Sequence, residues 1–294
     1  MDAHDKNETT KSRLGLVLEG GGMRGMYTAG VLDEFLLNDI HIDGLVGVSA
    51  GILHGISYIS RQYGRNIRYS VKYRHNKRFM SLRSLIKTGN ICETEFCYHE
   101  IPDELYPFDY VEFEKNAAGI EVYSCATNIE TGKPEYIRIY DAKKQVDAIR
   151  ASASLPLVSE TVEYNGMKLL DGGTADSIPI EFMRASGFAR NLVVLTRPAG
   201  YVKGKDNTIP LMKLKYKDYP GYIQAAKDRQ DAYNKTLERL KGYEEAGEVL
   251  ILQPSRDLGV GRTEKDVESL KRIYKLGRFD ARNRMEEILA YVKG

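Results

Sequence analysis

The chain has 294 residues, of which 42% are hydrophobic and 29% charged, and its formal net charge is +2. This composition is typical of a globular protein that buries a sizeable core, and the small net charge excludes a general attraction to polyanions. Three cysteines without CxxC spacing argue against a disulfide framework or a zinc site. Because no apolar run reaches the ~18–20 residues that span a bilayer, we expect a cytoplasmic protein for which any membrane contact would be peripheral.

The beginning of the chain predicts a strand, a glycine-rich loop and a helix. Residues 1–12 are polar and charged, which predicts a disordered leader and shows no signal peptide. Residues 13–19 form a mostly apolar run that predicts a strand. The sequence Gly20-Gly21-Gly22-Met23-Arg24-Gly25 follows at once, and apolar residues then recur at helical spacing.

Two functions are open for this loop. It matches G-x-G-x-x-G, which can hold a pyrophosphate, and it could instead offer bare backbone N–H groups to an oxyanion. A nucleotide site would need an acidic residue about 20 residues further on, at the end of a second strand. Asp39 and Asp43 lie near that distance, but the second strand leads into a serine. A P-loop is excluded because G-K-[ST] is absent, and we favour the oxyanion interpretation over a nucleotide site or a simple tight turn.

The serine belongs to a second strand–turn–helix unit. Residues 44–48 predict a short buried strand, Gly47-Val48-Ser49-Ala50-Gly51 matches G-x-S-x-G, and residues 52–59 are apolar at helical spacing. Such a turn holds the serine in a strained backbone, with its hydroxyl at the mouth of a sheet. Gly47 and Gly51 suit this turn because a Cβ at either position would collide with a neighbouring strand or helix. Ser49 is therefore a candidate nucleophile.

Two blocks of opposite charge follow. Residues 61–87 contain Lys and Arg but no acidic residue, whereas residues 93–121 are strongly acidic. The basic block could bind nucleic acid or an anionic membrane. We favour the simpler interpretation that the two blocks face each other or are separately solvated, and we expect no nucleic-acid partner. Residues 86–109 show little periodicity and could form a cap or lid beside the serine.

The remainder of the chain predicts further alternation of strands and helices. Strands are predicted at 121–126, 135–140, 166–170, 192–196 and 249–253, and helices at 146–152, 179–186, 225–245 and 264–292. Alternation with nearly continuous apolar strands predicts a mostly parallel sheet with helices on both faces. We expect a catalytic domain over residues 13–197, and a mostly helical C-terminal region over residues 198–294 that packs on it.

A histidine is an improbable base for Ser49. No histidine follows residue 99, which makes the usual Ser–His–Asp orders improbable, and His54 is expected to be a packed residue of the helix after the serine. Asp171 is a better candidate, because it lies at a predicted strand end and is followed by Gly172 and Gly173. A carboxylate there could accept the serine proton directly. The alternative is an aspartate that only caps backbone N–H groups, and Asp176 is a weaker candidate base.

The three glycine motifs, in this order and spacing, resemble those of the patatin-like phospholipase family. The small-residue segment 151–156 resembles the family's segment before its aspartate. The resemblance implies a three-layer α/β/α fold and a Ser–Asp dyad that acts on lipid acyl esters without metal or cofactor. Carried over to this chain, Ser49 is the nucleophile and Asp171 the base.

The resemblance also implies an oxyanion hole and a subgroup. The hole would consist of the amides of Gly20, Gly21 and Gly22 with Arg24 nearby, and Gly25 completes the motif. The whole chain is similar to bacterial patatin-like proteins with an extra C-terminal helical region. An acyltransferase on the same site and a non-catalytic lipid- or nucleotide-binding module stay open. The physiological substrate and the oligomeric state are not implied.

Overall fold

An eight-stranded mixed sheet is the centre of the protein, which we describe from a computed structural model of residues 12–294. The predicted leader therefore lies outside the described residues, except for Ser12. The strands are β1 (Leu14–Leu18), β2 (Gly44–Val48), β3 (Glu121–Asn128), β4 (Pro134–Arg138), β5 (Val162–Tyr164), β6 (Met167–Asp171), β7 (Arg190–Val194) and β8 (Val249–Leu252). Their order is β5-β6-β3-β2-β1-β7-β8, with β4 paired to β3. The pairs among β3, β2, β1, β7 and β8 are parallel, whereas those that involve β4, β5 and β6 are antiparallel.

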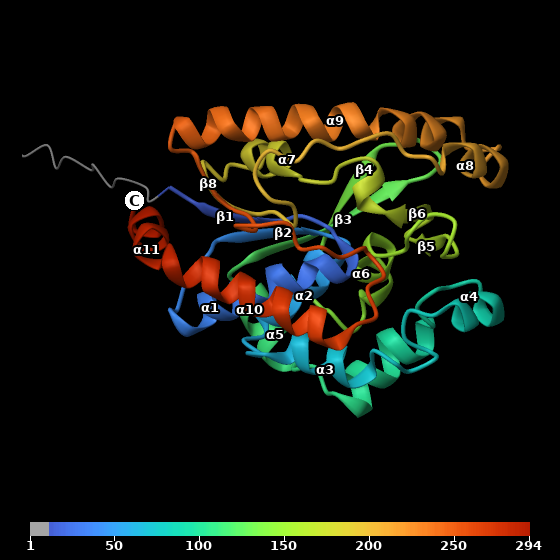
Figure 1. Ribbon diagram of the computed structural model, residues 1–294, viewed down its shortest axis with the longest axis horizontal. Helices are drawn as coiled ribbons and strands as arrows, with labels where there is room; N and C mark the ends of the chain where they lie inside the picture. The colour runs from blue at the N-terminus through green and yellow to red at the C-terminus, as the bar shows by residue number, and fades with distance from the viewer. Residues whose placement is uncertain (1–11) are drawn as a thin grey trace, which may run out of the picture.

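Helices cover both faces of this sheet. They are α1 (Met26–Leu37), α2 (Ala50–Ile59), α3 (Arg65–Tyr73), α4 (Leu82–Thr88), α5 (Tyr110–Ala117), α6 (Val146–Ser152), α7 (Ile180–Ala185), α8 (Ile209–Lys215), α9 (Pro220–Glu245), α10 (Val267–Asn283) and α11 (Met285–Lys293). Three shorter or wider turns of helix are η1 (Gly22–Gly25), η2 (Phe96–Leu105) and η3 (Gly172–Thr174). In Figure 1, α7 and α9 lie on one side of the sheet, and α1, α2, α3, α5 and α10 lie on the other. The expected three-layer α/β/α fold is confirmed.

The central strands are buried on both faces because their side chains alternate between two cores. Leu16 and Leu18 of β1 belong to the core under α1, α2 and α10, whereas Val17 belongs to the core under α7 and α9. In β2, Leu45 and Val46 divide in the same way. Alternating contact with two helical layers explains why these strands read as continuous apolar runs.

The register of the sheet also brings the C-terminal ends of β2 and β6 together. One edge of β3 pairs with β2 over Glu121–Cys125, and the next residues of β3, Ala126–Asn128, pair with β6. Because β2 is parallel and β6 antiparallel to β3, the last residues of β2 and β6 point toward each other along this edge. Val48 lies opposite Cys125, and Asp171 lies opposite the following residue. The fold thus brings the residue after β2 to the end of β6.

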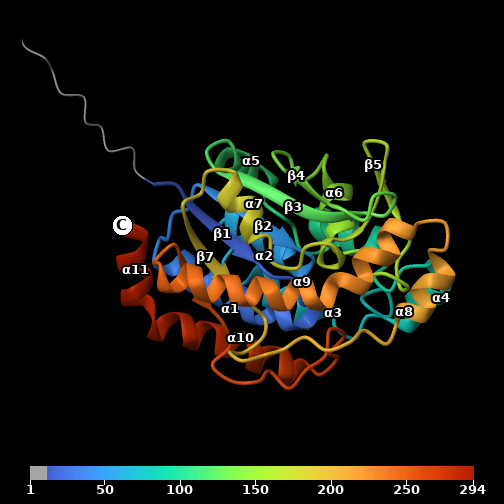
Figure 2. The same cartoon turned by 90° about the horizontal axis from the view of Figure 1, so that it is seen from above.

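The C-terminal part of the chain is joined to the rest by a strand and a helix. β8 extends the sheet by pairing with β7, and α10 packs along α1. A Cβ on Gly277 of α10 would lie 2.1 Å from the Tyr27 carbonyl oxygen of α1, so the two backbones approach closely. Buried Glu34 of α1 pairs with Arg278 at 2.6 Å and with Arg282 at 2.8 Å. The long helix α9 runs along the molecule in Figure 1 and Figure 2, and Figure 1 shows it on the side of the sheet opposite α10.

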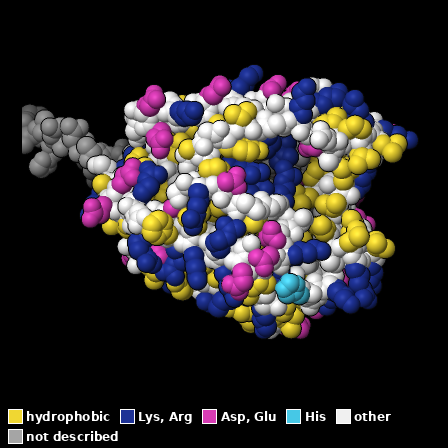
Figure 3. All heavy atoms as spheres, in the orientation of Figure 1, with side chains coloured by type: hydrophobic (Ala, Val, Ile, Leu, Met, Phe, Trp, Pro, Cys, Tyr) yellow, Lys and Arg dark blue, Asp and Glu magenta, His cyan; other side chains and the backbone are white. Residues whose placement is uncertain are grey.

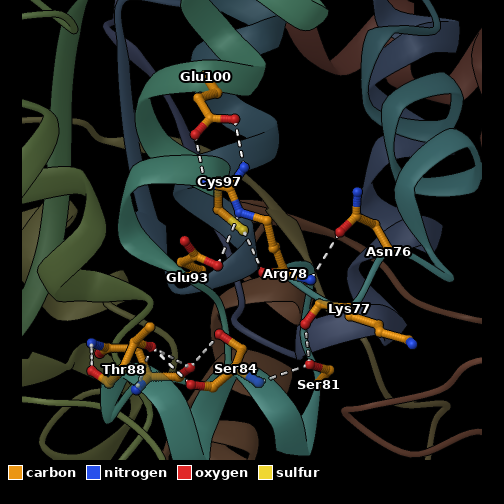
Figure 4. A network of polar contacts seen from close by, with 10 residues as sticks. Asn76, Lys77, Arg78, Ser81, Ser84, Thr88, Glu93, Cys97 and Glu100 are labelled. Atoms are coloured by element: carbon orange, nitrogen blue, oxygen red, sulfur yellow. Dashed lines mark hydrogen bonds and ion pairs between the residues drawn. The ribbon is translucent and has the colours of Figure 1, made fainter.

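The segment expected to be a cap is more ordered than its sequence pattern indicates. It contains the end of α4 and the π-helix η2, in which Pro102 removes a backbone donor. Arg78, from the basic block, reaches Glu93 at 3.0 Å and Glu100 at 2.7 Å in the acidic block (Figure 4). The two blocks therefore face each other at this point, and the bidentate pair holds η2 against the preceding chain.

Candidate active site

Ser49 lies at a sharp turn between β2 and α2. Its φ of 54° and ψ of −123° are unusual for a residue with a side chain, and they turn the chain from strand to helix within one residue. The Ser49 N–H donates to Ser152 Oγ at 2.8 Å, and that hydroxyl donates to the Cys125 carbonyl oxygen at 2.5 Å. The Ser152 hydroxyl of α6 thus joins this turn to β3.

The two elbow glycines permit this turn because backbone atoms approach them closely. A Cβ on Gly47 would lie 2.4 Å from the Ile52 nitrogen, and one on Gly51 would lie 2.4 Å from the Leu18 carbonyl oxygen. No side chain can be accommodated at these distances. The other motif glycines are also crowded by backbone or side-chain neighbours, namely Gly20 by Ser49 and Val48, Gly21 by Thr196, Gly22 by Arg262, Gly25 by Ala50 and His54, Gly172 by Cys125, and Gly173 by Asp171.

Asp171 is a buried carboxylate at the end of β6 with one free oxygen. Its Oδ1 accepts from the Gly173 N–H at 2.8 Å, whereas its Oδ2 is buried and has no hydrogen-bond partner within residues 12–294. Asp176 does not line the cavity at Ser49 but a hollow beside α9. Its carboxylate accepts from the Tyr136 hydroxyl at 2.7 Å. Burial raises the pKa of Asp176.

Ser49 and Asp171 line the same small cavity, as the meeting of β2 and β6 requires. Their side chains make no hydrogen bond to each other in the part of the chain that the structure describes. Catalytic hydrogen bonds are often long in the absence of substrate and tighten in the reacting complex. The arrangement can therefore provide a nucleophile and a proton acceptor on one cavity wall.

The glycine-rich loop forms another wall of this cavity. Gly20, Gly21 and Gly22 all line it, and within residues 12–294 no backbone carbonyl accepts from their N–H groups. The next amide, that of Met23, donates to the Arg262 carbonyl oxygen at 2.9 Å. The loop therefore has unused donors beside Ser49, and the chain before α10 lies directly against it.

The acids considered for a nucleotide site lie away from this loop. The Asp43 carboxylate accepts from the Leu14 N–H at 2.7 Å. This bond lies at the N-terminal ends of β1 and β2, whereas the glycine-rich loop follows the C-terminal end of β1. Asp39 is exposed and pairs with Arg61 at 2.9 Å. Neither carboxylate can reach a ligand held by the glycine-rich loop.

His54 is packed rather than placed between Ser49 and Asp171. It is buried on α2 beside Gly25, and neither ring nitrogen has a hydrogen-bond partner among the described residues. Burial lowers the pKa of His54 to about 4, so the ring is neutral near pH 7. Its position agrees with the expectation of a packed residue.

On one side of Ser49 a large apolar cavity opens under the cap. Its volume is about 140 Å³, close to the ~150 Å³ of an engineered apolar cavity that binds benzene. The lining is mostly hydrophobic and comes from α1, α2, the chain between α3 and α4, the cap and α6; it includes Met26, Leu53, Phe79, Met80, Tyr98, Ile101, Phe108 and Ile149. The cavity can therefore accept an apolar chain whose end reaches Ser49.

On the other side of Ser49 lies the smaller cavity, of about 30 Å³, with Asp171 and the glycine-rich loop. Four basic residues line it, Arg24, Lys203, Arg229 and Arg262. Sequence reasoning identified Arg24 but missed the other three, because they come from loops and a helix far along the chain and share no motif. Figure 3 shows Lys and Arg side chains inside a hollow on this face of the molecule.

The described residues provide neither a metal-binding cluster nor a membrane-spanning helix. Within residues 12–294, no group of three or more His, Cys, Asp or Glu side chains is placed to hold a metal ion. None of the helices in this range combines the length and the apolar character needed to cross a membrane.

Comparison with known proteins gives two family matches. The profile described as patatin-like phospholipase matches residues 16–184, and that of a domain of unknown function, DUF6363, matches residues 219–293. The first range ends in the last turn of α7, and it includes all three glycine motifs.

The individual proteins that match this chain have low sequence identity to it. The uncharacterized protein YjjU of Escherichia coli is 29% identical over 189 residues, covering 64% of this chain and 53% of that protein. Lysophospholipase NTE1 of Candida albicans is 28% identical over 183 residues, covering 62% of this chain and 13% of that protein. The chain thus spans about half of YjjU and a small part of NTE1. The solved structure of VipD from Legionella pneumophila is 13% identical with a TM-score of 0.48, covering 96% of this chain and 69% of that one. Since the first profile covers more than half of its residues, the chain belongs to the patatin-like phospholipase family.

Proposed function

We propose that the protein is a serine acyl-ester hydrolase that cleaves lipid esters through an acyl-enzyme on Ser49. The Ser49 Oγ attacks the ester carbonyl carbon while its proton passes to Asp171 Oδ2. Collapse of the tetrahedral intermediate releases the alcohol, which takes that proton from Asp171. Water then attacks the acyl-serine, with Asp171 accepting and returning its proton, and a fatty acid is released.

The observation that carries this proposal is the pairing of a strained serine with an unpartnered carboxylate oxygen in one cavity. A backbone conformation such as that of Ser49 is costly and persists where surrounding structure enforces it, which is common at active sites. The bond from Gly173 orients Asp171 so that its second oxygen stays free. Membership of the patatin-like phospholipase family and similarity to NTE1, a lysophospholipase, support lipid esters as the substrates.

Oxyanion stabilisation would come from the glycine-rich loop. The unused N–H groups of Gly20, Gly21 and Gly22 lie on the wall beside Ser49, and the N-terminus of α2 adds a favourable dipole. A single such donor contributes about 3–4 kcal/mol in comparable hydrolases. The buried guanidinium of Arg24 adds positive charge at the same wall.

The test combines labelling with two variants. A fluorophosphonate probe should label the wild-type protein on Ser49, and Ser49→Ala should abolish both labelling and hydrolysis of a short acyl nitrophenyl ester. Asp171→Asn should lower turnover at least about a hundredfold while leaving the fold intact, because the two side chains have the same shape. Asp176→Asn is the matched control and should retain activity. Unchanged turnover in Ser49→Ala or Asp171→Asn defeats the proposal.

Acyl transfer on the same site would differ only in the acceptor. Turnover in the presence of glycerol or a lysolipid, followed by product analysis, separates the two reactions. Hydrolysis predicts free fatty acid as the main product at all acceptor concentrations. A non-catalytic lipid- or nucleotide-binding module predicts ligand binding with neither product nor probe labelling.

We also propose that the protein docks peripherally on an anionic membrane through α4 and α8. Both helices lie at the same end of the molecule in Figure 1 and Figure 2. Ile86 of α4 is 80% exposed and Leu214 of α8 is 76% exposed, and Leu82 and Leu211 are also exposed. Basic residues flank them, namely Arg83, Lys87, Lys213, Lys215 and Lys217. Apolar side chains surrounded by Lys and Arg suit a surface of anionic lipid.

Flotation with phosphatidylglycerol-containing vesicles tests this docking surface. The double variant Ile86→Ser, Leu214→Ser should reduce the bound fraction, because it removes apolar surface that would enter the lipid. Val111→Ser, at a residue that is 79% exposed on α5, is the matched control and should bind as the wild type does. Equal binding by the double variant and the wild type contradicts the docking surface.

A further inference from the structure

The small cavity beside Ser49 concentrates positive charge that nearby acids offset only in part. Arg24 belongs to the glycine-rich loop, Lys203 lies in the loop before α8, Arg229 is on α9, and Arg262 precedes α10. Arg24 is only 6% exposed. The Nε atoms of Arg24 and Arg229 are buried without a hydrogen-bond partner in the described residues.

No carboxylate within residues 12–294 forms an ion pair with any of these four side chains. Three acids lie close enough to act on these cations through their charge, Glu19 on Arg24 and Asp171 and Asp206 on Arg229, but none forms an ion pair with them. Glu19 accepts from the Tyr233 hydroxyl at 2.7 Å and from the Thr196 N–H at 2.6 Å, and Asp171 accepts from Gly173. Burying unpaired cations is costly, and this cost lowers their pKa values. Burial with the neighbouring guanidinium groups lowers the pKa of Lys203 to about 7, and burial also lowers that of Arg24 to about 10.

The C-terminal part of the chain positions these cations on the catalytic cavity. The Met23 N–H donates to the Arg262 carbonyl oxygen, and a Cβ on Gly22 would lie 2.5 Å from the same oxygen. The loop that carries Arg262 is therefore in backbone contact with the glycine-rich loop. Three of the four cations belong to the chain after residue 197, whereas Ser49 and Asp171 belong to the chain before it.

The two cavities meet at Ser49, and they have opposite character. The larger cavity is apolar and the smaller one is cationic, and both are lined by Gly22, Ser49 and Leu155. An amphiphile with one acyl chain fits this arrangement if its ester lies over Ser49 and its charged end lies a few atoms away. A phosphate group matches a cluster of guanidinium and ammonium donors, because it offers several anionic acceptor oxygens.

We propose that Arg24, Lys203, Arg229 and Arg262 form a phosphate-binding subsite, so that the substrates are monoacyl lipids with a phosphate close to the ester. This inference rests on the proposed hydrolase function and specifies its substrate class. The phosphate of the head group supplies the missing counter-charge, and the acyl chain enters the apolar cavity. The C-terminal region thereby selects the head group for a reaction that the preceding part of the chain carries out.

The test compares two esters with the same acyl chain, monodecanoylglycerol phosphate and monodecanoylglycerol. The wild-type kcat/KM should be at least about tenfold higher for the phosphate ester, since each 1.4 kcal/mol is tenfold. Arg229→Gln and Arg262→Gln should each lower this ratio about tenfold or more, as expected when one charged donor is removed. Lys241→Gln, at an exposed position of the same helix α9, is the matched control and should leave the ratio unchanged.

Binding to Ser49→Ala protein separates this inference from the hydrolase proposal. Calorimetry should show tighter binding of the phosphate ester than of the neutral ester, with the difference lost in the Ser49→Ala, Arg262→Gln double variant. Equal binding or equal kcat/KM for the two esters overturns the phosphate subsite, even if Ser49-dependent hydrolysis is found. Absence of hydrolysis defeats the proposed reaction, and the binding difference still decides the subsite. Tight binding of inorganic phosphate alone, without preference for the phosphate ester, overturns the head-group assignment.

Discussion

The parts of the chain before and after residue 197 contribute differently to one site. The earlier part supplies the strained serine, the free carboxylate oxygen, the glycine-rich loop and the apolar cavity. The later part supplies three cations and the loop whose carbonyl oxygen binds the Met23 amide. The groups proposed to react thus lie at strand ends, whereas three of the four cations lie on elements further along the chain.

The earlier part would thus carry out the reaction, and the later part would select the head group of the substrate. Strand ends position a side chain tightly because the sheet register fixes the backbone on both sides, as Val48 opposite Cys125 and Asp171 opposite Ala126 illustrate. The cations lie on loops and on one face of α9, where substitutions alter the charge of the cavity without moving the sheet. The same reaction could therefore be directed to other head groups by changes in the later part alone.

The largest expected effect concerns the reacting groups. Asp171→Asn should lower kcat by about 10²–10⁴-fold, which is the range for loss of a general base. KM should not rise, because the proposed phosphate site consists of the four cations, and loss of the Asp171 charge removes an anion from the cavity that they share. Steady-state kinetics on monodecanoylglycerol phosphate measures both values. A large rise in KM with normal kcat would instead assign Asp171 to substrate binding.

Next in size is the contact that holds the later part in place. Gly277→Ala puts a Cβ 2.1 Å from the Tyr27 carbonyl oxygen, so α10 must move away from α1. Such overpacking costs about 1–3 kcal/mol of unfolding free energy, and thermal denaturation should show a lower Tm. Gly242→Ala on α9 is the control, because nothing lies within 4 Å of its Cβ and helix propensity should raise the Tm slightly. Equal Tm values for Gly277→Ala and the wild type would show that α10 is not packed as described.

The apolar cavity predicts a smaller, selective effect. Ala153 lines it beside Ser49, and Ala153→Met should fill part of its volume of about 140 Å³. The kcat/KM for a decanoyl ester should fall about tenfold or more relative to an acetyl ester, since each methylene in such a pocket contributes about 1–3 kcal/mol. Nitrophenyl esters of different chain length measure this ratio. An unchanged ratio would place the acyl chain outside this cavity.

The smallest effect concerns the pH dependence of anion binding. The pKa of Lys203 is about 7 in the protein, so the side chain is charged below pH 7 and largely neutral above it. Sulfate keeps its charge over this range, and its binding at higher pH must be accompanied by proton uptake. Its affinity should therefore fall about tenfold between pH 6 and pH 8, one pKa unit being a factor of ten.

The matched variant for that measurement is Lys203→Gln. It removes the titrating group, so the sulfate affinity of this variant should be nearly independent of pH between 6 and 8. Isothermal calorimetry at both pH values provides the comparison. A pH dependence that persists in Lys203→Gln would assign the titration to another group of the cavity.

The strand–turn–helix units around Gly20–Gly25 and Ser49 could be predicted from the sequence because their signals are local. Apolar runs, a glycine turn and helical spacing each occupy only a few consecutive residues. The helix expected over 264–292 is instead divided at Arg284 into α10 and α11. The break lets the Tyr291 hydroxyl donate to the Glu248 carbonyl oxygen at 2.7 Å, beside the sheet. No local pattern reports this tertiary contact.

The charged half of the site could not be predicted for the same reason. Lys203, Arg229 and Arg262 lie in separate elements within a region already rich in lysine and arginine, so nothing in the sequence sets them apart. The π-helix η2 was also missed, because its Pro102 and irregular apolar spacing are typical of a loop. Its order depends on contacts such as those of Arg78 with Glu93 and Glu100.

The central claim is that the substrate's acyl group is transferred to Ser49, and peptide mapping by mass spectrometry tests it most directly. Protein mixed with nitrophenyl decanoate and quenched in acid should carry one decanoyl group on the peptide that contains Ser49. The adduct should be absent from Ser49→Ala protein. A decanoyl group on any other residue, or full turnover by Ser49→Ala, would contradict the account.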